Sequence, residues 1–452
     1  MSVPQAVPTR VHRMSFAQFA MRAPGLLGDR AEAIRRIALD YGDLVEMPIP
    51  GKHIHIVTSP ELARHVLQHN NKNYRRSFDF RIMQTFLGDG LITTHDEFWQ
   101  HARRAAMPAF RQRFVESLTD AIAFETSEYF DEALGNDQST RLTHAAMSVL
   151  SLRLFASTML SVNVRNEEGR FLKAMQVAVR HLDRRLAAVV DTDAFMPTLS
   201  KRRFHKATAE IDEILATWMR TRLSHPGEKD DLMALLLRAS ADIEESKRSS
   251  WLRDQVLTSL AAGHETVAVA LAWCLLMLAT HQAVQDRVRA ETLGKVGARG
   301  VLRESVPTLA YTDAVVCETL RLYPSVWSIG REALGEDRFG DAVIPAGATV
   351  MVCPYAIHRR PDLWADADQF IPDRFLAGPP ARPFQYLPFS GGPRHCIGDH
   401  LSMLELKIVI ATLVSRYRIE RVDNRRVGKE PLVSLRPHPD FELRFTPIPR
   451  PT

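Results

Sequence analysis

The chain has 452 residues, of which 45% are hydrophobic and 25% are charged, an ordinary composition for a soluble globular protein. Its formal net charge of +5 is mildly basic. Because Lys and Arg do not cluster as in nucleic-acid binders, we interpret the excess as a solvated face or a docking patch for an acidic protein. The cysteines Cys274, Cys317, Cys353 and Cys396 lie far apart, which excludes CxxC metal and redox motifs and provides no disulfide framework. A reducing cytoplasm is the simplest interpretation.

Residues 1–30 are expected to be irregular, because prolines and Gly25 interrupt any long helix. Residues 31–41 follow an amphipathic helical pattern, residues 45–48 and 53–57 read as a hairpin, and Ser59-Pro60 begins a helix that reaches about residue 68. The N-terminus lacks the apolar core of a signal peptide. The longest apolar run, residues 267–279, has 13 residues and is too short to span a bilayer. We therefore expect a soluble protein without a membrane anchor.

Residues 74–95 show no clean period and are rich in large apolar side chains, which is typical of a buried loop. The next stretch, residues 96–110, is predicted to be helical and places Trp99 and Arg103 on one face. Residues 115–250 are mostly helical in pattern, and residues 239–250 are polar enough to be a surface connection.

Residues 251–282 are long, proline-free and strongly apolar, which predicts a central buried helix. Its middle contains Ala262-Gly263-His264-Glu265-Thr266, where the glycine, the charged pair and the threonine each cost up to about 1 kcal/mol in helix propensity. Such a cost in the most apolar helix favours a functional explanation. A helix kink with a back-bonded threonine is the alternative.

Residues 311–323 form a further predicted helix, which carries Glu318 and Arg321 on one face and is stopped by Pro324. A Pro-Asp-Arg-Phe sequence at residues 372–375 follows, with Arg374 in third position. Residues 349–353 are strand-like. Residues 432–445 alternate apolar and polar residues, which suggests a C-terminal hairpin.

Residues 389–398, Phe-Ser-Gly-Gly-Pro-Arg-His-Cys-Ile-Gly, lead into a helical pattern that begins just after Cys396. The paired glycines allow a tight turn and close approach to a flat partner. A cysteine at a helix N-terminus is favoured as a thiolate. The alternatives are a small buried cysteine and a zinc site with His395 and His400, which lacks a fourth ligand at a usual spacing.

Within this loop, Phe389, Gly392, Arg394, Cys396 and Gly398 match the haem-binding loop of the cytochrome P-450 family. The WxxxR, AGHET, ExxR and Pro-Asp-Arg-Phe motifs follow the order of that family, so the chain from about residue 31 resembles a soluble bacterial-type member. The resemblance implies a mainly α fold with a minor β portion. It also implies one domain, residues 31–452, in which a long central helix lies over a haem held by the Cys loop.

The resemblance also implies roles for individual residues. Cys396 would ligate the iron of haem b, with Phe389 shielding the sulfur and Gly398 leaving room beside it. Thr266 and Glu265 would deliver protons, and Glu318, Arg321 and Arg374 would form a structural charge network. Haem propionates would be held by Trp99, Arg103, Arg331 and Arg394. The substrate pocket would be lined by Phe78, Phe80, Ile82, Met83, Phe86, Ala262, Val326, Trp327 and Val433.

The implied activity is monooxygenation of a hydrophobic substrate, such as a terpenoid or polyketide intermediate of secondary metabolism, with dioxygen as co-substrate. The sequence ends without a flavin or iron–sulfur domain, so we expect electrons from NAD(P)H to arrive through a ferredoxin or flavodoxin and its reductase. We expect a cytoplasmic monomer that binds no nucleic acid. A peroxide-driven haem-thiolate enzyme and a non-catalytic haem-thiolate sensor or carrier are the alternatives.

Overall fold

The computed structural model describes residues 10–448 apart from residues 50, 135–140, 143, 189–192, 194–195, 197, 225–229 and 297–300. The chain divides into two compact units. The first, which we call the sheet unit, contains residues 1–79, 317–396 and 429–436. The second, the helical unit, contains residues 80–316, 397–428 and 437–452. Each unit is assembled from three separate segments, so neither corresponds to one contiguous stretch of sequence.

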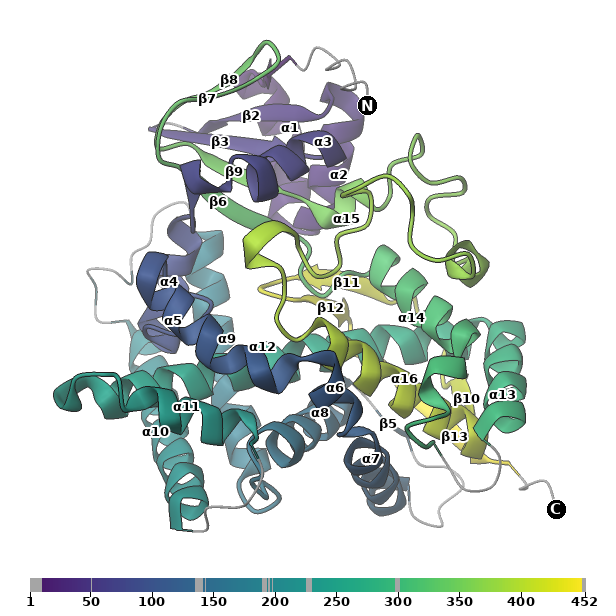
Figure 1. The fold of residues 1–452 in the computed structure, drawn as a ribbon. Coiled ribbons are helices and arrows are strands. Elements are labelled where there is room, and N and C mark those ends of the chain that lie inside the picture. The colour runs from purple at the N-terminus through teal and green to yellow at the C-terminus, as the bar shows by residue number, and fades with distance from the viewer. Residues whose placement is uncertain are drawn as a thin grey trace. The chain divides into compact units, whose positions relative to one another are not determined.

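The sheet unit is built on a six-stranded sheet that combines the N-terminal strands with strands from a later part of the chain (purple and green in Figure 1). Its strand order is β1 (His12–Arg13), β2 (Leu44–Ile49), β3 (Lys52–Val57), β9 (Thr349–Val352), β6 (Ile329–Ala333) and β4 (Tyr74–Arg75). The predicted hairpin is confirmed, since β2 and β3 pair antiparallel from Leu44 opposite Val57 to Ile49 opposite Lys52. A small two-stranded sheet of β7 (Asp337–Phe339) and β8 (Ala342–Ile344) also belongs to this unit.

The helices of the sheet unit begin with α1 (Phe16–Leu27) and α2 (Arg30–Tyr41). The remaining ones are α3 (Pro60–Arg64), the π-helix η1 (His65–His69), α15 (Pro354–Ile357) and the 3₁₀ turns η2 (Asn71–Asn73), η7 (Pro372–Phe375) and η8 (Gly392–Arg394). The prediction that Ser59 begins a helix is confirmed, because its side chain caps α3 by accepting from the Leu62 amide.

The prediction of an irregular stretch over residues 1–30 is wrong for residues 16–27, and residues 1–9 lie outside the described residues. Helix α1 begins with a capping box in which Ser15 and Gln18 each accept from the other's backbone amide. Pro24 lies inside the helix. The caps satisfy amides that would otherwise have no partner, which favours the helix even though Pro24 removes one donor.

The helical unit is arranged around α12 (Glu245–Thr280), which packs against α8, α10, α11, α13 and α16. The unit contains α5 (Asp96–Ala106), η3 (Met107–Phe110), α6 (Gln112–Glu116), α7 (Thr119–Leu134), α8 (His144–Met159), α9 (Glu168–Ala187), α10 (Leu199–Ser224), α11 (Leu232–Ser240), α13 (Gln282–Val296), η6 (Val306–Thr308) and α16 (Asp399–Arg416). Two helices, α4 (Phe78–Leu87) and α14 (Ala310–Leu322), contain a boundary between the units.

The predicted central helix is confirmed, but it begins earlier than the sequence suggested. Residues 245–250, expected in a surface connection, form the first turns of α12. These residues are polar and exposed, and exposed polar side chains are compatible with a helix although they give no apolar periodicity. Among the described helices, α12 is the one long and apolar enough to cross a membrane, and 72% of its most apolar window is buried.

The prediction of a loop is wrong for residues 78–87, which form α4. Phe86 and Leu87 are buried, whereas Phe78, Phe80, Ile82 and Met83 keep some exposure. Because apolar residues lie on more than one side of this helix, no single apolar stripe appears in the sequence.

The predicted C-terminal hairpin over residues 432–445 is also wrong. Strand β12 (Leu435–His438) pairs with β11 (Gly428–Pro431), whereas β13 (Leu443–Pro447) pairs antiparallel with β10 (Tyr417–Arg421) and with β5 (Arg141–Leu142). Pro437 and Pro439 have no amide hydrogen, which disfavours a continuous ladder between neighbouring strands at this point. The alternation is present, but β12 pairs with the strand just before this stretch, and β13 pairs with β10 and β5 from more distant parts of the chain.

Candidate functional site

The loop that carries Cys396 closes on itself through two backbone hydrogen bonds. The Cys396 amide donates to the Phe389 carbonyl at 3.0 Å, and the His395 amide donates to the Gly392 carbonyl at 3.0 Å. Ser390 and Gly392 adopt left-handed conformations with φ of 63° and 69°. As a result the loop presents an exposed thiol at Cys396, three residues before α16 begins at Asp399.

Gly392 is required for the position of this loop. A Cβ at residue 392 would overlap the carbonyl oxygen of Leu67 in η1, and the left-handed φ would strain any other residue. A Cβ at Gly391 would meet the ring of Phe384. The predicted tight turn is therefore present, and its glycines let the loop rest directly on the backbone of η1.

A buried histidine, His358, connects the start of the Cys loop to α14. Its Nε2 accepts from the Leu387 amide at 2.7 Å, and its Nδ1 lies 3.1 Å from the Arg321 carbonyl. Burial and then the charge of Arg321 lower the pKa of His358 to about 3. The neutral ring donates from Nδ1 and accepts at Nε2, so it holds two backbone segments together with one fixed tautomer.

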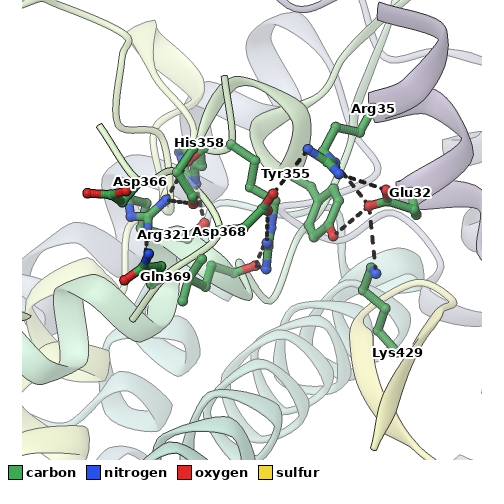
Figure 2. A network of polar contacts seen from close by, with 12 residues as sticks. Glu32, Arg35, Arg321, Tyr355, His358, Asp366, Asp368, Gln369 and Lys429 are labelled. Atoms are coloured by element: carbon green, nitrogen blue, oxygen red, sulfur yellow. Dashed lines mark hydrogen bonds and ion pairs between the residues drawn. The ribbon is translucent and has the colours of Figure 1, made fainter. Parts of the chain in front are cut away.

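The three residues predicted to form a charge network do contact one another. Arg321 Nε donates to Glu318 Oε2 at 2.6 Å, and Arg374 Nε donates to Glu318 Oε1 at 3.3 Å. Arg321 also donates to the carbonyl oxygens of His358, Ala367 and Gln369 (Figure 2). Glu318 and Arg321 are both fully buried. Since one broken partner in such a network leaves a buried charge uncompensated, its role is to hold this part of the fold.

A second charged group in the same unit joins α2 to the chain that follows α15. Arg35 pairs with Glu32 at 2.9 Å and with Asp368 at 3.5 Å, and Tyr355 donates to Glu32 (Figure 2). Burial alone would raise the pKa of Glu32, but the hydrogen bond and charge of Arg35 and the charge of Lys429 lower it to about 2. This ion-paired group ties distant segments of the sheet unit together.

A third group consists mainly of arginines. Arg331 is 5% exposed on β6, and its Nη1 donates to the Gly330 carbonyl at 2.8 Å. Burial lowers the pKa of Arg331 to about 10, and Asp79 acts in the opposite direction. For Arg76, burial and then the charges of Arg331 and Arg394 lower the pKa. The charges of Arg331 and Arg394 therefore act on Arg76, and the carboxylate of Asp79 acts on both Arg76 and Arg331.

Gly330 brings the segment with Arg76 against β6. A Cβ at residue 330 would overlap the hydroxyl of Ser77 and crowd the carboxylate of Asp79, and Ser77 in turn donates to Asp79. Sequence reasoning predicted Arg331 and Arg394 but missed Arg76. The neighbouring Arg75 makes an exposed pair with Glu332, and the Arg75-Arg76 dipeptide gives no sign of which arginine turns inward.

These features of the sheet unit fit an iron porphyrin with two carboxylates. An exposed cysteine sulfur on a glycine loop provides one soft donor for iron. The positive charges of Arg76, Arg331 and Arg394, which act on one another, suit bound carboxylates that would stabilise these cations. Among the described residues, no group of three or more His, Cys, Asp or Glu could hold a metal ion, so the zinc alternative at residues 395–400 has no support.

In the helical unit, the predicted motif lies within α12, which is helical throughout. The Thr266 hydroxyl donates to the Ala262 carbonyl at 2.7 Å, the back-bonding that the structural alternative anticipated. His264 is buried with Nδ1 2.8 Å from the Leu260 carbonyl, and its own carbonyl accepts from Ser151 of α8. Gly263 faces α8, where a Cβ would overlap the ring of Phe155. The glycine thus allows close helix packing.

Trp99 and Arg103 lie on one face of α5, as predicted. The guanidinium carbon of Arg103 is 5.6 Å from the centre of the Trp99 ring. This cation–π contact orients the arginine along the helix and is compatible with a carboxylate ligand.

The predicted pocket segments of the sheet unit contact each other. The Leu435 amide donates to the Ser325 carbonyl, and Trp327 Nε1 donates to the Leu432 carbonyl at 2.8 Å. Trp327 is 7% exposed and packs in a hydrophobic cluster, whereas Val326 is 39% exposed. In the helical unit, the Phe86 ring packs edge-on against Phe204 of α10. Burial of Trp327 and Phe86 is therefore explained by core packing.

The sequence matches the family model described as Cytochrome P450 over residues 19–445. It is 31% identical over 391 residues to a cyclooctat-9-en-7-ol 5-monooxygenase of Streptomyces melanosporofaciens, covering 84% of this chain and 83% of that protein. It is 29% identical over 419 residues to a cyclooctatin synthase of the same organism, covering 91% and 89%. The protein LUTEIN DEFICIENT 5 of Arabidopsis thaliana is 30% identical, covering 84% of this chain and 68% of that protein.

Proposed function

The chain belongs to the cytochrome P450 family and is a monooxygenase, and we propose that it oxidises a hydrophobic terpenoid with a haem whose iron is bound by Cys396. When bound, haem supplies the activation of dioxygen for insertion of one oxygen atom into the substrate. The observation that carries the proposal is the exposed Cys396 thiol on the closed glycine loop, in the same unit as a cluster of arginines.

We assign a separate role in binding haem or delivering protons to each of several side chains. Cys396 would supply the thiolate, and Phe389, whose carbonyl accepts from the Cys396 amide, would shield the sulfur. Arg76, Arg331 and Arg394, with Trp99 and Arg103, would bind the carboxylates. Thr266 would give up its bond to the Ala262 carbonyl in order to hold a proton for delivery, and Glu265 would resupply that proton through water. Because a hydroxyl can donate and accept at once, Thr266 suits such a relay.

Iron ligation is tested with Cys396→Ser and, as a matched control, Cys353→Ser. Cys353 is buried and its sulfur lies 3.6 Å from the Met351 carbonyl, a contact that a serine hydroxyl can keep. We expect the reduced carbonyl complex to lose its strongly red-shifted Soret band in the first variant and to retain it in the control. Retention of the band in Cys396→Ser would mean that another group binds the iron.

The role of Thr266 is tested with Thr266→Ala and with Thr280→Ala, which removes the same kind of back-bond, from Thr280 to Leu276, at the end of the same helix. We expect Thr266→Ala to keep the fold and the haem spectrum while more hydrogen peroxide and less product form per NAD(P)H consumed. Unchanged coupling in Thr266→Ala, or equal uncoupling in Thr280→Ala, would assign proton delivery to another group.

The substrate class follows from two observations. The predicted pocket segments are mainly apolar, and apolar walls favour burial of apolar ligands at about 25 cal/mol per Å². A relative named for oxidation of cyclooctat-9-en-7-ol covers most of the chain. We expect cyclic terpene alcohols to shift the Soret band at micromolar concentration. Binding only of small charged compounds would contradict this assignment.

P450 enzymes take electrons from redox partners. We propose that a ferredoxin or flavodoxin, with its NAD(P)H-dependent reductase, reduces this protein. We also propose that the protein is a monomer in the cytoplasm. The formal net charge of +5 favours an acidic partner. Reduction should therefore slow as salt is added, because the Debye length falls to about 8 Å at physiological ionic strength. A rate independent of salt would indicate an apolar contact.

A further inference from the structure

The turn after α4 is held against α12 by three consecutive residues, which we call the α4 clamp: Arg253, Asp254 and Gln255. Arg253 Nη1 donates to the Phe86 carbonyl at 3.0 Å. Asp254 Oδ2 accepts from the Asp89 amide at 2.7 Å, and Gln255 Nε2 donates to the Asp89 carbonyl at 2.9 Å. Three side chains of one helix thus bind backbone groups within four residues of the turn.

Glycines let the turn lie directly on the helix. A Cβ at Gly88 would overlap the Asp254 carboxylate, and a Cβ at Gly90 would overlap the Thr258 hydroxyl. Gly88 also has a left-handed φ of 62°. A side chain at either glycine would displace Asp254 or Thr258, and the left-handed φ of Gly88 disfavours other residues, so residues 88–90 are shaped to fit α12.

Arg253 extends the clamp to a second helix. Its guanidinium pairs with Asp212 of α10 at 2.7 Å and with Asp254 at 3.0 Å. The side chains of Arg253 and Asp254 are 19% and 14% exposed. Burial raises the pKa of Asp254, while the Asp89 amide and Arg253 oppose this effect. Because these groups are partly desolvated, their mutual contacts are stronger than those of an exposed pair.

The clamp acts on the end of a helix that carries expected substrate contacts. Phe86 packs against Phe204 of α10, and Arg185 of α9 donates to Thr85 at 3.2 Å. The clamp also lies on the same helix as Ala262 and Thr266. From Asp254 these residues are about 12 Å and about 18 Å along the axis at 1.5 Å per residue. A change in the clamp would therefore alter how the C-terminal end of α4 is held against α12.

We propose that the α4 clamp determines which substrates are admitted, by fixing the C-terminal end of α4 to α12 and α10. Its residues are positioning residues: they contact the backbone of α4 and the following turn, and α4 would contact the substrate. The inference rests on the proposed function for the role of α4 as a substrate wall. An intact clamp excludes bulky ligands, and a broken clamp lets α4 move outward and admits them.

The first measurement is amide hydrogen exchange over residues 84–94 in the haem-loaded protein without substrate. We compare Asp254→Ala, Arg253→Met and the milder Arg253→Lys with Arg248→Met. Arg248 lies on the same helix, but its guanidinium donates to the carbonyls of Ser240 and Ala241. We expect exchange at Asp89 to accelerate at least tenfold in Asp254→Ala and to remain unchanged in Arg248→Met. Unaltered amide exchange at Asp89 in Asp254→Ala would show that the clamp does not hold the turn after α4.

The second measurement is the ratio of affinities for a bulky aryl azole and for imidazole, read from Soret shifts. Imidazole is small enough to need no movement of α4, so we expect its affinity to stay constant. Affinity for the bulky azole should rise about tenfold when Asp254 or Arg253 is replaced. Faster exchange with an unchanged ratio would reduce the clamp to a structural contact and overturn its role in selection. Failure of the proposed function would appear separately, as absence of any haem or imidazole spectrum, while the exchange measurement would still decide whether the clamp exists.

Discussion

Two groups of arginines in the sheet unit, one around Arg321 and one around Arg76, differ in the charges that surround them. Each of the five N–H groups of Arg321 donates to a carboxylate or carbonyl oxygen of the chain. For Arg76, in contrast, the charges of Arg331 and Arg394 lower the pKa and the charge of Asp79 raises it. A buried guanidinium with five acceptors stabilises the fold, whereas gathered cations are stabilised when anions bind. The difference separates a structural group from a proposed ligand site that contains the same residue type.

The largest expected effect comes from Glu318→Ala, which breaks the network of Glu318, Arg321 and Arg374. Arg321 and Arg374 both lose their carboxylate, and removing one partner of a buried ion pair costs about 3–5 kcal/mol. Denaturant unfolding should show this loss together with lower haem retention. As a control, Glu61→Ala removes a pair with Arg382 in which both side chains are about half exposed, and should cost about 1 kcal/mol or less. Similar losses in both variants would contradict the assignment.

His358→Phe should have the next largest effect, because it leaves the Leu387 amide and the Arg321 carbonyl without their hydrogen-bond partner. An unsatisfied buried polar group costs about 1–3 kcal/mol. The unfolded histidine binds a proton near pH 6.5, whereas the folded one does so only near pH 3. Protonation therefore favours unfolding, and wild-type stability should fall as pH decreases through this window. The variant should lack that component, and an identical pH profile would argue against a neutral His358.

Arg76→Met should differ from these variants in its effect on the protein without haem. Removing one of three neighbouring cations relieves the repulsion from Arg331 and Arg394, so we expect the haem-free protein to lose no stability. Haem should dissociate about tenfold faster, because one of the cations proposed to bind its carboxylates is lost. The adjacent Arg75→Met is the control, because Arg75 is 47% exposed and pairs with Glu332. Loss of stability in haem-free Arg76→Met would place Arg76 among the structural arginines instead.

Glu32→Gln should have the smallest effect at neutral pH, because glutamine keeps the size of the side chain and an oxygen that can accept from Arg35 or Tyr355. The folded-state pKa of about 2 lies below the ordinary value of 4.5. The stability that Glu32 contributes is therefore complete above pH 4.5 and is lost as pH falls toward 2. Acid unfolding of the variant should be less steep in this range. An unchanged acid transition would show that Arg35 does not stabilise the charged form.

The sequence alone determined the features that depend on local order and spacing. The Cys loop, the AGHET helix, the pairing of Glu318 with Arg321 and the first hairpin are short patterns whose partners lie within a few residues, or whose motifs occur in a family order. The family assignment follows from these patterns, and the comparisons agree with it.

Tertiary structure decided the features whose partners are distant in the chain. Residues 78–87 became helix although their apolar residues lie on several faces, and β13 took β10 as its partner instead of β12. Arg76 differs from Arg75 only in which neighbour it meets, and that neighbour, Arg331, lies about 250 residues away. In the sequence, Arg253 and Asp254 are two adjacent charged residues, and nothing indicates that they contact the turn after α4. Burial and long-range contact, which set the electrostatic roles of these residues, exist only once the chain has folded.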